Sequence, residues 1–248
     1  MTGEVVISVN NLTKQFGTFT AVDSINLDVY RGEIFGFIGA NGAGKTTAMR
    51  MITGLLEPSS GEAIVAGFKV TQHPEQVKKR IGYMSQRFSL YEDLTVSENI
   101  EFFGGIYGLT DYQIETQMNL VLQELEMMHM RRTLVRELPL GWKQKLAFST
   151  ALLHGPEVVF LDEPTGGVDP ITRRQFWDKM YKEADRGTTI FVTTHYMDEA
   201  EYCDRVSIMV DGQIIALDSP QNLKNQFRSD SMDEVFVKLA RSAKRSDL

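Results

Sequence analysis

The segment GANGAGKT, residues 39–46, has the composition and spacing of a loop that binds phosphate. It fits G-x-x-x-x-G-K-[ST] in full, with an apolar run before it and a helical pattern after it. Glycines let backbone N–H groups turn inward around phosphate oxygens, and the N-terminus of the following helix adds its positive dipole. We expect the phosphate site to include Gly39, Asn41, Gly42, Ala43, Gly44, Lys45, Thr46 and Thr47.

Four side chains have the types that nucleoside triphosphate chemistry requires. Lys45 is expected to reach the β- and γ-phosphates, and Thr46 to offer its hydroxyl to Mg²⁺. The apolar segment VVFLDE ends in Asp162 and Glu163, and strand alternation predicts that these carboxylates point in opposite directions. We therefore expect different tasks for them. Asp162 suits the role of the carboxylate that contacts Mg²⁺ from a neighbouring strand. Glu163 suits the role of the group that orients water against the γ-phosphate.

A histidine stands in a comparable place. His195 ends the apolar segment TTIFVTTH, at the carboxyl edge of the same expected sheet, where ligands collect. We expect it to contact the γ-phosphate. The other histidines, His73, His129 and His154, have no such placement.

The elements that must position these side chains follow from hydrophobic periodicity. Short apolar runs predict strands at 34–39, 61–67, 80–85, 157–163, 188–195, 205–210 and 213–218. Asp211–Gly212 predicts a hairpin between the last two of these strands. Alternating strands at 5–9 and 25–30 suggest a small antiparallel layer, and helical spacing dominates from Thr95 to about Leu153.

Buried strands alternating with helices indicate an α/β fold. We predict a P-loop NTPase core with a mostly parallel sheet, an antiparallel β subdomain and an inserted α-helical subdomain. All of 1–248 forms one domain in this prediction. Residues 1–86 and 155–218 form the RecA-like core with its antiparallel layer, 87–154 the helical subdomain, and 219–248 a C-terminal helical tail.

Composition excludes several classes of protein. The formal net charge is −7, which argues against a nucleic-acid surface. The single cysteine, Cys203, excludes an internal disulfide framework and fits a reducing cytoplasm. No apolar run approaches the ~18 residues of a membrane span. The N-terminus lacks a basic segment followed by an apolar one, so we expect no secretion signal.

The order of the motifs resembles the ATP-binding subunit of an ABC transporter. The P-loop is followed by YMSQRFSLYEDLTVSENI, LPLGWKQKL, VVFLDEPTGGVDP and TTHYMDEAE, so the resemblance covers nearly the whole chain. MDEAEYCDR with the later MDEVFVKL is similar to the ABC-2-type exporter branch, which moves drugs, lipids or polysaccharides outward.

The resemblance implies ATP hydrolysis with ATP and Mg²⁺, and a second ATP-binding subunit that is either a copy or a paralogue. It also implies an integral membrane partner, which would dock near Phe88 to Tyr91, and a cytoplasmic location on the inner face of the cell membrane. No nucleic acid is expected as a partner.

Individual roles also follow from the resemblance. Phe16 falls where the family places an aromatic that stacks on adenine, with a core role as the alternative. Gln86 matches the glutamine that touches the magnesium shell and senses the membrane partner. Asp169 matches the D-loop aspartate that crosses the dimer, Glu163 the hydrolytic glutamate and His195 the switch histidine.

One motif departs from the family pattern. In the family, LSGGQ opens a helix whose N-terminus clamps the γ-phosphate of ATP held by the opposite subunit, and here the segment reads LPLGW. Pro139 removes the serine hydroxyl and Leu140 removes a glycine, whereas Gly141 is retained. Proline suits a first helical turn, so the dipole and the N–H donors remain. We expect the clamp to be weakened but not abolished by the loss of a hydrogen bond that contributes about 1.5–3 kcal/mol.

Two alternatives stay open at this point. The chain could be a non-transport ABC-type ATPase that acts on DNA, ribosomes or cofactor assembly, although the acidic balance counts against DNA. It could also be a regulatory cassette with weak hydrolysis, which only LPLGW suggests. The presence of Lys45, Glu163 and His195 argues against that reading.

Overall fold

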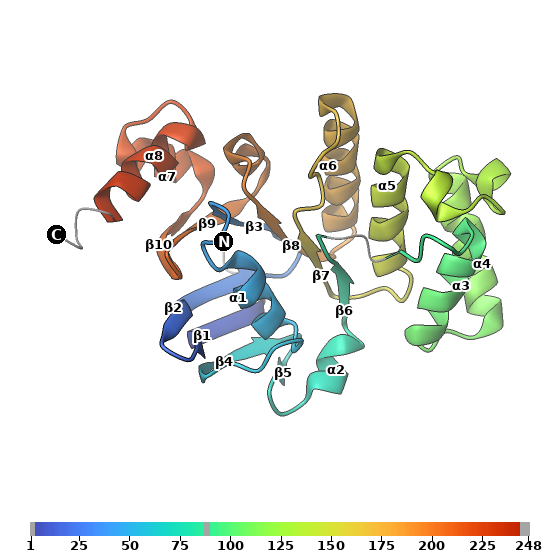
Figure 1. Cartoon of the computed structure of the whole chain (residues 1–248), viewed down its shortest axis with the longest axis horizontal. Helices are drawn as coiled ribbons and strands as arrows, with labels where there is room; N and C mark the ends of the chain where they lie inside the picture. Colours follow the sequence, from blue (N-terminus) through green and yellow to red (C-terminus); the bar gives the residue numbers. More distant parts are fainter. Residues whose placement is uncertain (1–2, 87–89, 244–248) are drawn as a thin grey trace.

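A six-stranded sheet with the strand order β10-β9-β3-β8-β7-β6 forms the centre of the fold (Figure 1). The computed structural model describes residues 3–86 and 90–243. Its central strands are β3 (Ile34–Gly39), β6 (Ile81–Met84), β7 (Val158–Asp162), β8 (Thr189–Thr194), β9 (Arg205–Val210) and β10 (Gln213–Asp218). The first five pair in parallel, and β10 pairs antiparallel with β9.

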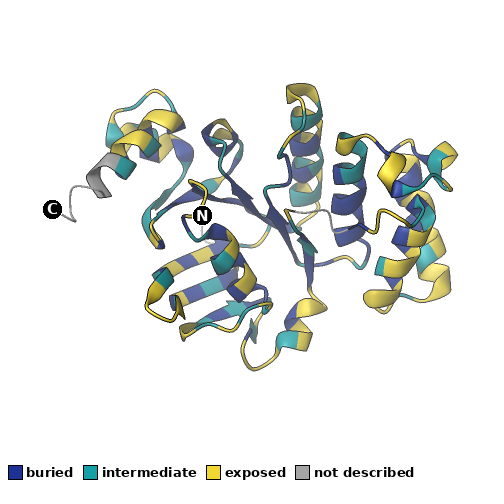
Figure 2. Ribbon diagram, viewed as in Figure 1, coloured by how far each residue is buried: buried dark blue, intermediate teal, exposed yellow. Residues whose placement is uncertain are grey.

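Burial explains why these strands read as continuous apolar runs. Every residue of β3, β7 and β8 is buried, because both faces of the sheet are covered (Figure 2). The predicted hairpin between β9 and β10 is confirmed. Asp211 and Gly212 both have positive φ, 46° and 84°, as a two-residue turn of this kind requires.

A second, antiparallel sheet has the order β2-β1-β4-β5. Its strands are β1 (Val5–Phe16), β2 (Phe19–Tyr30), β4 (Ser60–Val65) and β5 (Phe68–Lys69). The predicted antiparallel layer is therefore present, with longer strands than the sequence pattern suggested. Register shifts along the β1–β2 pair, one of them between Val9 and Leu12, break the alternation that would have revealed the full length of β1.

The helices surround the central sheet. They are α1 (Lys45–Ile52), α2 (Pro74–Lys78), α3 (Val96–Ile106), α4 (Asp111–Glu124), α5 (Leu140–Ala151), α6 (Pro170–Asp185), α7 (Pro220–Phe227) and α8 (Met232–Ala243), with 3₁₀ turns η1 (Met128–Met130), η2 (Val135–Glu137) and η3 (Met197–Tyr202). Thr95 and Thr110 begin α3 and α4 with capping boxes. Among the residues that the structure describes, no helix has both the length and the apolarity needed to cross a membrane.

Two apolar cores hold the layers together. One lies between the central sheet, the antiparallel sheet and α1, and includes Phe35, Phe37 and Phe191. The other covers the opposite face of the sheet and continues without a break into α3, α4 and α5. In Figure 1, α3 and α4 lie at one end of the molecule and α7 and α8 at the other.

Candidate functional site

The loop between β3 and α1 is shaped by glycines that no other residue could replace without strain. A Cβ atom on Gly39 would lie 2.4 Å from the carbonyl oxygen of Met209 on β9. Gly44 has φ of 104°, and a Cβ there would lie 2.5 Å from the carbonyl oxygen of Ala21. The chain can therefore pass between its neighbours and turn its N–H groups inward only because side chains are absent at these points.

Lys45 begins α1 and is held inside the loop. Its ammonium group donates to the carbonyl oxygens of Gly39 at 2.8 Å and Ala40 at 3.0 Å. The side chain is only 5% exposed, and this burial lowers the pKa of Lys45, an effect that the nearby Glu163 and Asp162 oppose. A bound phosphate would give this buried cation a strong counter-charge.

Thr46, Asp162 and Thr193 form a second polar group. The hydroxyl of Thr46 lies 3.1 Å from the nearer carboxylate oxygen of Asp162, and the hydroxyl of Thr193 donates to that carboxylate at 2.6 Å. Burial, and then the charge of Asp162, raises the pKa of Tyr83 to about 12. Sequence reasoning missed Thr193. Thr193 is one of three threonines in β8, and only its register opposite Asp162 on the adjacent strand marks it out.

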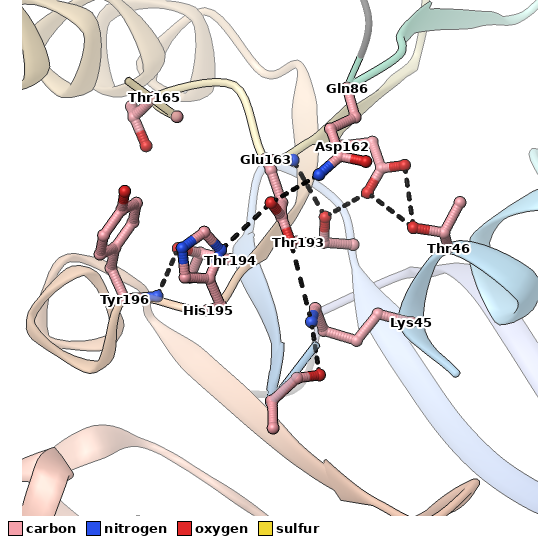
Figure 3. Close-up of polar contacts among 12 residues, drawn as sticks. Lys45, Thr46, Gln86, Asp162, Glu163, Thr165, Thr193, Thr194, His195 and Tyr196 are labelled. Atoms are coloured by element: carbon pink, nitrogen blue, oxygen red, sulfur yellow. Dashed lines mark hydrogen bonds and ion pairs between the residues drawn. The ribbon is translucent and has the colours of Figure 1, made fainter. Parts of the chain in front are cut away.

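Glu163 lies where three nitrogen-bearing side chains converge, and one of them, Gln86, donates a hydrogen bond to it (Figure 3). Its carboxylate is 2.9 Å from Nε2 of Gln86, 3.1 Å from Nδ1 of His195 and 3.8 Å from Nζ of Lys45. The structure thus brings together four predicted residues from four separate segments. Donors that gather around one anionic group are also suited to the γ-phosphate of a nucleotide.

The backbone of Glu163 corrects one expectation. Strand alternation was expected to separate the two carboxylates, but β7 ends at Asp162 and Glu163 has φ of 50°, in the left-handed region. The backbone N–H of Glu163 donates to the carbonyl and hydroxyl oxygens of Thr193 at 3.2 Å and 3.0 Å. The carboxylates do have different partners, but a strained turn rather than the pleat of the strand directs Glu163.

The P-loop borders an open cleft of about 310 Å³. Its lining consists of Phe19, Ala21, Asn41, Gly42, Gly44, Lys45, Thr46, Thr47, Gln86 and Glu163. Two predicted residues shape the loop instead of lining the cleft. Gly39 contributes its carbonyl to Lys45, and Ala43 is buried.

The aromatic side chain in this cleft differs from the expected one. Phe16 does not line the cleft, and its ring lies 5.3 Å from Nζ of Lys14. Phe19, which pairs with Phe16 across the β1–β2 turn, lines the cleft and is 65% exposed. The core alternative for Phe16 does not hold, because this ring is 51% exposed.

The LPLGW segment does begin a helix, one residue later than expected. Pro139 occupies the N-cap position with ψ of 149°, outside the first helical turn, and α5 begins at Leu140. The carbonyl of Pro139 accepts from the N–H groups of Trp142 at 3.0 Å and Lys143 at 3.1 Å. A Cβ atom on Gly141 would lie 2.6 Å from Cγ2 of Thr172, so this glycine allows α5 to approach α6 closely.

Asp169 has a local role in the structure. Its carboxylate caps α6, accepting from the N–H groups of Ile171 and Thr172 at 3.0 Å and from the hydroxyl of Thr172 at 2.6 Å. These bonds, above all the hydroxyl bond, lower the pKa of Asp169. Asp169 and Gly141 line a second pocket of about 360 Å³. Within the part of the chain that is described, this pocket shares no lining residue with the P-loop cleft.

The segment expected to meet a membrane partner is described only in part. Phe88 lies outside the described residues. Leu90 is buried, whereas Tyr91 is half exposed and packs edge-on against Phe102 with ring centroids 4.6 Å apart.

Known proteins share both this sequence and this arrangement. The ABC transporter family model matches residues 22–166. The probable multidrug ABC transporter ATP-binding protein YbhF of Escherichia coli (strain K12) is 45% identical over 242 residues, which cover 96% of this chain and 42% of that protein. The chain thus spans less than half the length of this relative. The linearmycin resistance ATP-binding protein LnrL of Bacillus subtilis (strain 168) is 33% identical over 233 residues, covering 94% of this chain and 75% of that protein.

The fold comparison agrees. A solved structure described as the ATP-binding subunit of an ABC transporter superposes with a TM-score of 0.85 at 30% identity, covering 94% of this chain and 99% of that one. The two sheets, the inserted helices and the P-loop cleft are therefore those of an ABC ATPase. This chain belongs to the ABC transporter family as an ATP-binding cassette, the component that binds and hydrolyses ATP.

Proposed function

We propose that two such cassettes, either identical or paralogous, trap two ATP molecules between them and power export through a separate integral membrane partner. The observation that carries this proposal is the convergence of Lys45, Gln86 and His195 on the carboxylate of Glu163 beside the P-loop cleft. That geometry provides both the donors for a γ-phosphate and a carboxylate beside it that can orient water.

The P-loop face is proposed to bind the triphosphate. Lys45 would pair with the β- and γ-phosphates, and the N–H groups of Gly42 and Gly44 would face the phosphate oxygens. Phe19 is the aromatic that lines the cleft, and Phe16 stays the sequence-based prediction for adenine stacking. Both stand at the β1–β2 turn, so the base would rest against this turn in either case.

The same cleft fits Mg²⁺. Thr46 and Asp162 present a hydroxyl and a carboxylate within 3.1 Å of each other, and Gln86 adds an amide to the lining. Among the described residues, no group of three or more His, Cys, Asp or Glu side chains is arranged to hold a metal ion. Such a sparse oxygen set suits a metal whose other ligands are water and substrate phosphates. Bound there, Mg²⁺ would neutralise charge on the β- and γ-phosphates.

The hydrolytic roles are proposed for Glu163 and His195. Glu163 would accept a proton from the attacking water or polarise it. His195, which already contacts this carboxylate, would support the γ-phosphate from the other side. Lys45 would neutralise charge that develops on the transferred phosphate.

The second grip on ATP is proposed to come from the LPLGW helix of the other cassette. The first N–H groups of a helix have no intrahelical partner, and at α5 these belong to Leu140 and Gly141. They lie in a pocket separate from the P-loop cleft of the same chain, which is the arrangement that a clamp acting on a partner's nucleotide requires. Asp169 lines that pocket and would face the dimer interface.

The membrane partner is proposed to dock near Phe88 to Tyr91, as the sequence predicts, and to insert a short helix into a cleft formed by α2, β6 and the ends of α1 and α3. This cleft measures about 380 Å³ and is lined by Thr53, Leu55, Glu75, Lys78, Lys79, Ile81, Tyr83, Ile106, Tyr107 and Gly108. Leu55 is 49% exposed and Ile106 is 62% exposed, so both can be covered by a partner. This docking would hold the cassette on the inner face of the cell membrane. Export is inferred from the names of two relatives, a probable multidrug ABC transporter ATP-binding protein and a linearmycin resistance ATP-binding protein.

Glu163→Gln tests the proposal. The amide keeps the shape but cannot take a proton, so ATP hydrolysis should fall by about 10²- to 10⁴-fold while ATP still binds. The variant should accumulate as an ATP-bound dimer, measured by light scattering after size exclusion. Glu62→Gln, on the surface of β4, serves as the control and should hydrolyse ATP normally. Hydrolysis by Glu163→Gln at the unaltered rate would refute the role of Glu163. Co-purification with an integral membrane protein tests the transport role.

A further inference from the structure

A fully buried carboxylate outside the nucleotide cleft joins the two loops that carry the hydrolytic residues. Glu199 lies on η3 and has no exposed surface. One of its oxygens accepts from the hydroxyl of Thr165 at 2.5 Å, and the other accepts from the hydroxyl of Thr194 at 2.6 Å. Both threonine residues are themselves buried.

These two threonines belong to the segments that carry Glu163 and His195. Thr165 follows Glu163 by two residues, and Thr194 directly precedes His195. The hydroxyl of Thr194 also accepts from the backbone N–H of Tyr196, which turns the chain after β8. Glu199 therefore fixes the distance between the segments that bring Glu163 and His195 together.

Arg173 balances the charge of this carboxylate. Its Nε lies 3.5 Å from Glu199, and its guanidinium stacks 4.3 Å from the ring centroid of Tyr196. The same guanidinium reaches Asp198 at 3.4 Å. A buried carboxylate is costly unless it is paired and accepts hydrogen bonds, and here both conditions are met by partners from three segments.

We propose that Glu199 is a positioning residue for ATP hydrolysis, which sets the contact of 3.1 Å between His195 and Glu163 by holding Thr165 and Thr194. This inference rests on the proposed function. Glu199 does not line the P-loop cleft, so it affects the geometry of the γ-phosphate and the attacking water rather than the binding of ATP.

Glu199→Gln is the decisive variant. An amide offers one acceptor and one donor in place of two acceptors, so one of the two threonine hydroxyls loses its acceptor. Because a displacement of about 1 Å at a catalytic group can reduce the rate about 10²-fold, kcat should fall by about tenfold to a hundredfold while the KM for ATP stays unchanged. Glu199→Asp, which is shorter by one methylene, should not restore kcat because it cannot reach both hydroxyls.

Two controls separate positioning from general destabilisation. Asp198→Asn removes a neighbouring acidic group that contacts the same Arg173 but is largely exposed, and kcat should remain normal. Leu223→Ala removes a buried apolar side chain on α7, and should lower the melting temperature without changing kcat at a temperature well below it.

A double variant tests the pathway. Thr165→Val alone should reduce kcat, and adding it to Glu199→Gln should reduce kcat by less than the product of the two separate effects. If Glu199→Gln hydrolysed ATP with the same kcat as the active unaltered protein, the inference would be overturned. A fall in kcat that Leu223→Ala reproduces at equal melting temperature would overturn it as well. If the unaltered protein itself failed to hydrolyse ATP, the proposed function would be the idea at fault.

Discussion

The proline before α5 makes the strength of the proposed nucleotide clamp measurable. Pro139 holds the N-cap position and makes no side-chain bond to the first turn. A serine there would accept a hydrogen bond from the N–H groups of that turn and could still donate its own proton to a phosphate oxygen. The informative comparison is Pro139→Ser with Pro139→Ala, because alanine removes the ring without adding a hydroxyl.

The expected gain follows from the number of clamps. A hydrogen bond to a charged group contributes about 1.5–3 kcal/mol, and a dimer of identical chains has two clamps, so the gain should be about 3–6 kcal/mol. Since 1.4 kcal/mol corresponds to a factor of ten, the Kd of the ATP-bound dimer should fall by about 10²- to 10⁴-fold. ADP lacks the γ-phosphate and should show no comparable gain.

Sedimentation of both variants with Mg²⁺ and ATP, in the Glu163→Gln background, measures this difference. The serine cap should also stabilise the monomer relative to alanine by about 0.5–2 kcal/mol, which melting without nucleotide records separately. An identical dimer Kd for Pro139→Ser and Pro139→Ala, despite the gain in monomer stability, would show that this helix start does not hold the nucleotide.

Three further outcomes test the structure. Thr193 donates to the buried carboxylate of Asp162 and accepts from the N–H of Glu163, so Thr193→Val should lower the free energy of unfolding, with about 1.5–3 kcal/mol from the bond to the carboxylate alone, measured by urea denaturation. Thr189→Val on the same strand loses only a bond from a backbone N–H and should cost about 0.5–1.5 kcal/mol, and equal costs would contradict the charge-assisted bond. Burial lowers the pKa of His154 in the folded protein. As pH falls, the unfolded chain therefore takes up a proton at this histidine before the folded protein does, and the free energy of unfolding should decrease below the ordinary pKa of 6.5. His154→Phe should weaken that dependence in urea titrations at pH 7.5 and about pH 5.5, and an unaltered slope would count against it. Glu163→Gln should raise the affinity for ATP but not for ADP, because it releases donors that only a γ-phosphate uses, and calorimetry showing equal changes would contradict this.

The parts of the site that sequence predicted are those whose chemistry is local. The P-loop is one short segment in which the glycines are required by the backbone, either for a positive φ or for a close approach to a neighbouring strand. A match to the sequence pattern therefore implies its geometry. Asp162 could be predicted because a buried strand that ends in a carboxylate beside a P-loop has few other uses. The positions of the central strands along the chain and the hairpin at Asp211–Gly212 followed from periodicity and turn chemistry in the same way.

The parts that sequence missed depend on contacts between distant segments or on single backbone angles. Alternation fails at Glu163 because a positive φ ends the strand one residue early. α6 is not predicted, although Asp169 and Pro170 form a cap and a first-turn proline, because its buried stripe consists only of Phe176, Trp177 and Met180. Phe19 enters the cleft through the geometry of the β1–β2 turn, which composition does not encode.

The arrangement around Glu163 links binding to catalysis in a direct way. Lys45, Gln86 and His195 all contact its carboxylate, so a γ-phosphate that recruits these side chains would compete for them with Glu163, the proposed base. In the proposed function, binding of ATP would therefore release the carboxylate toward water at the moment when the phosphate is held. This exchange needs donors whose positions do not shift as the anion changes. Glu199 lies outside the cleft and engages both supporting loops without touching the nucleotide, so it is placed to keep those positions fixed.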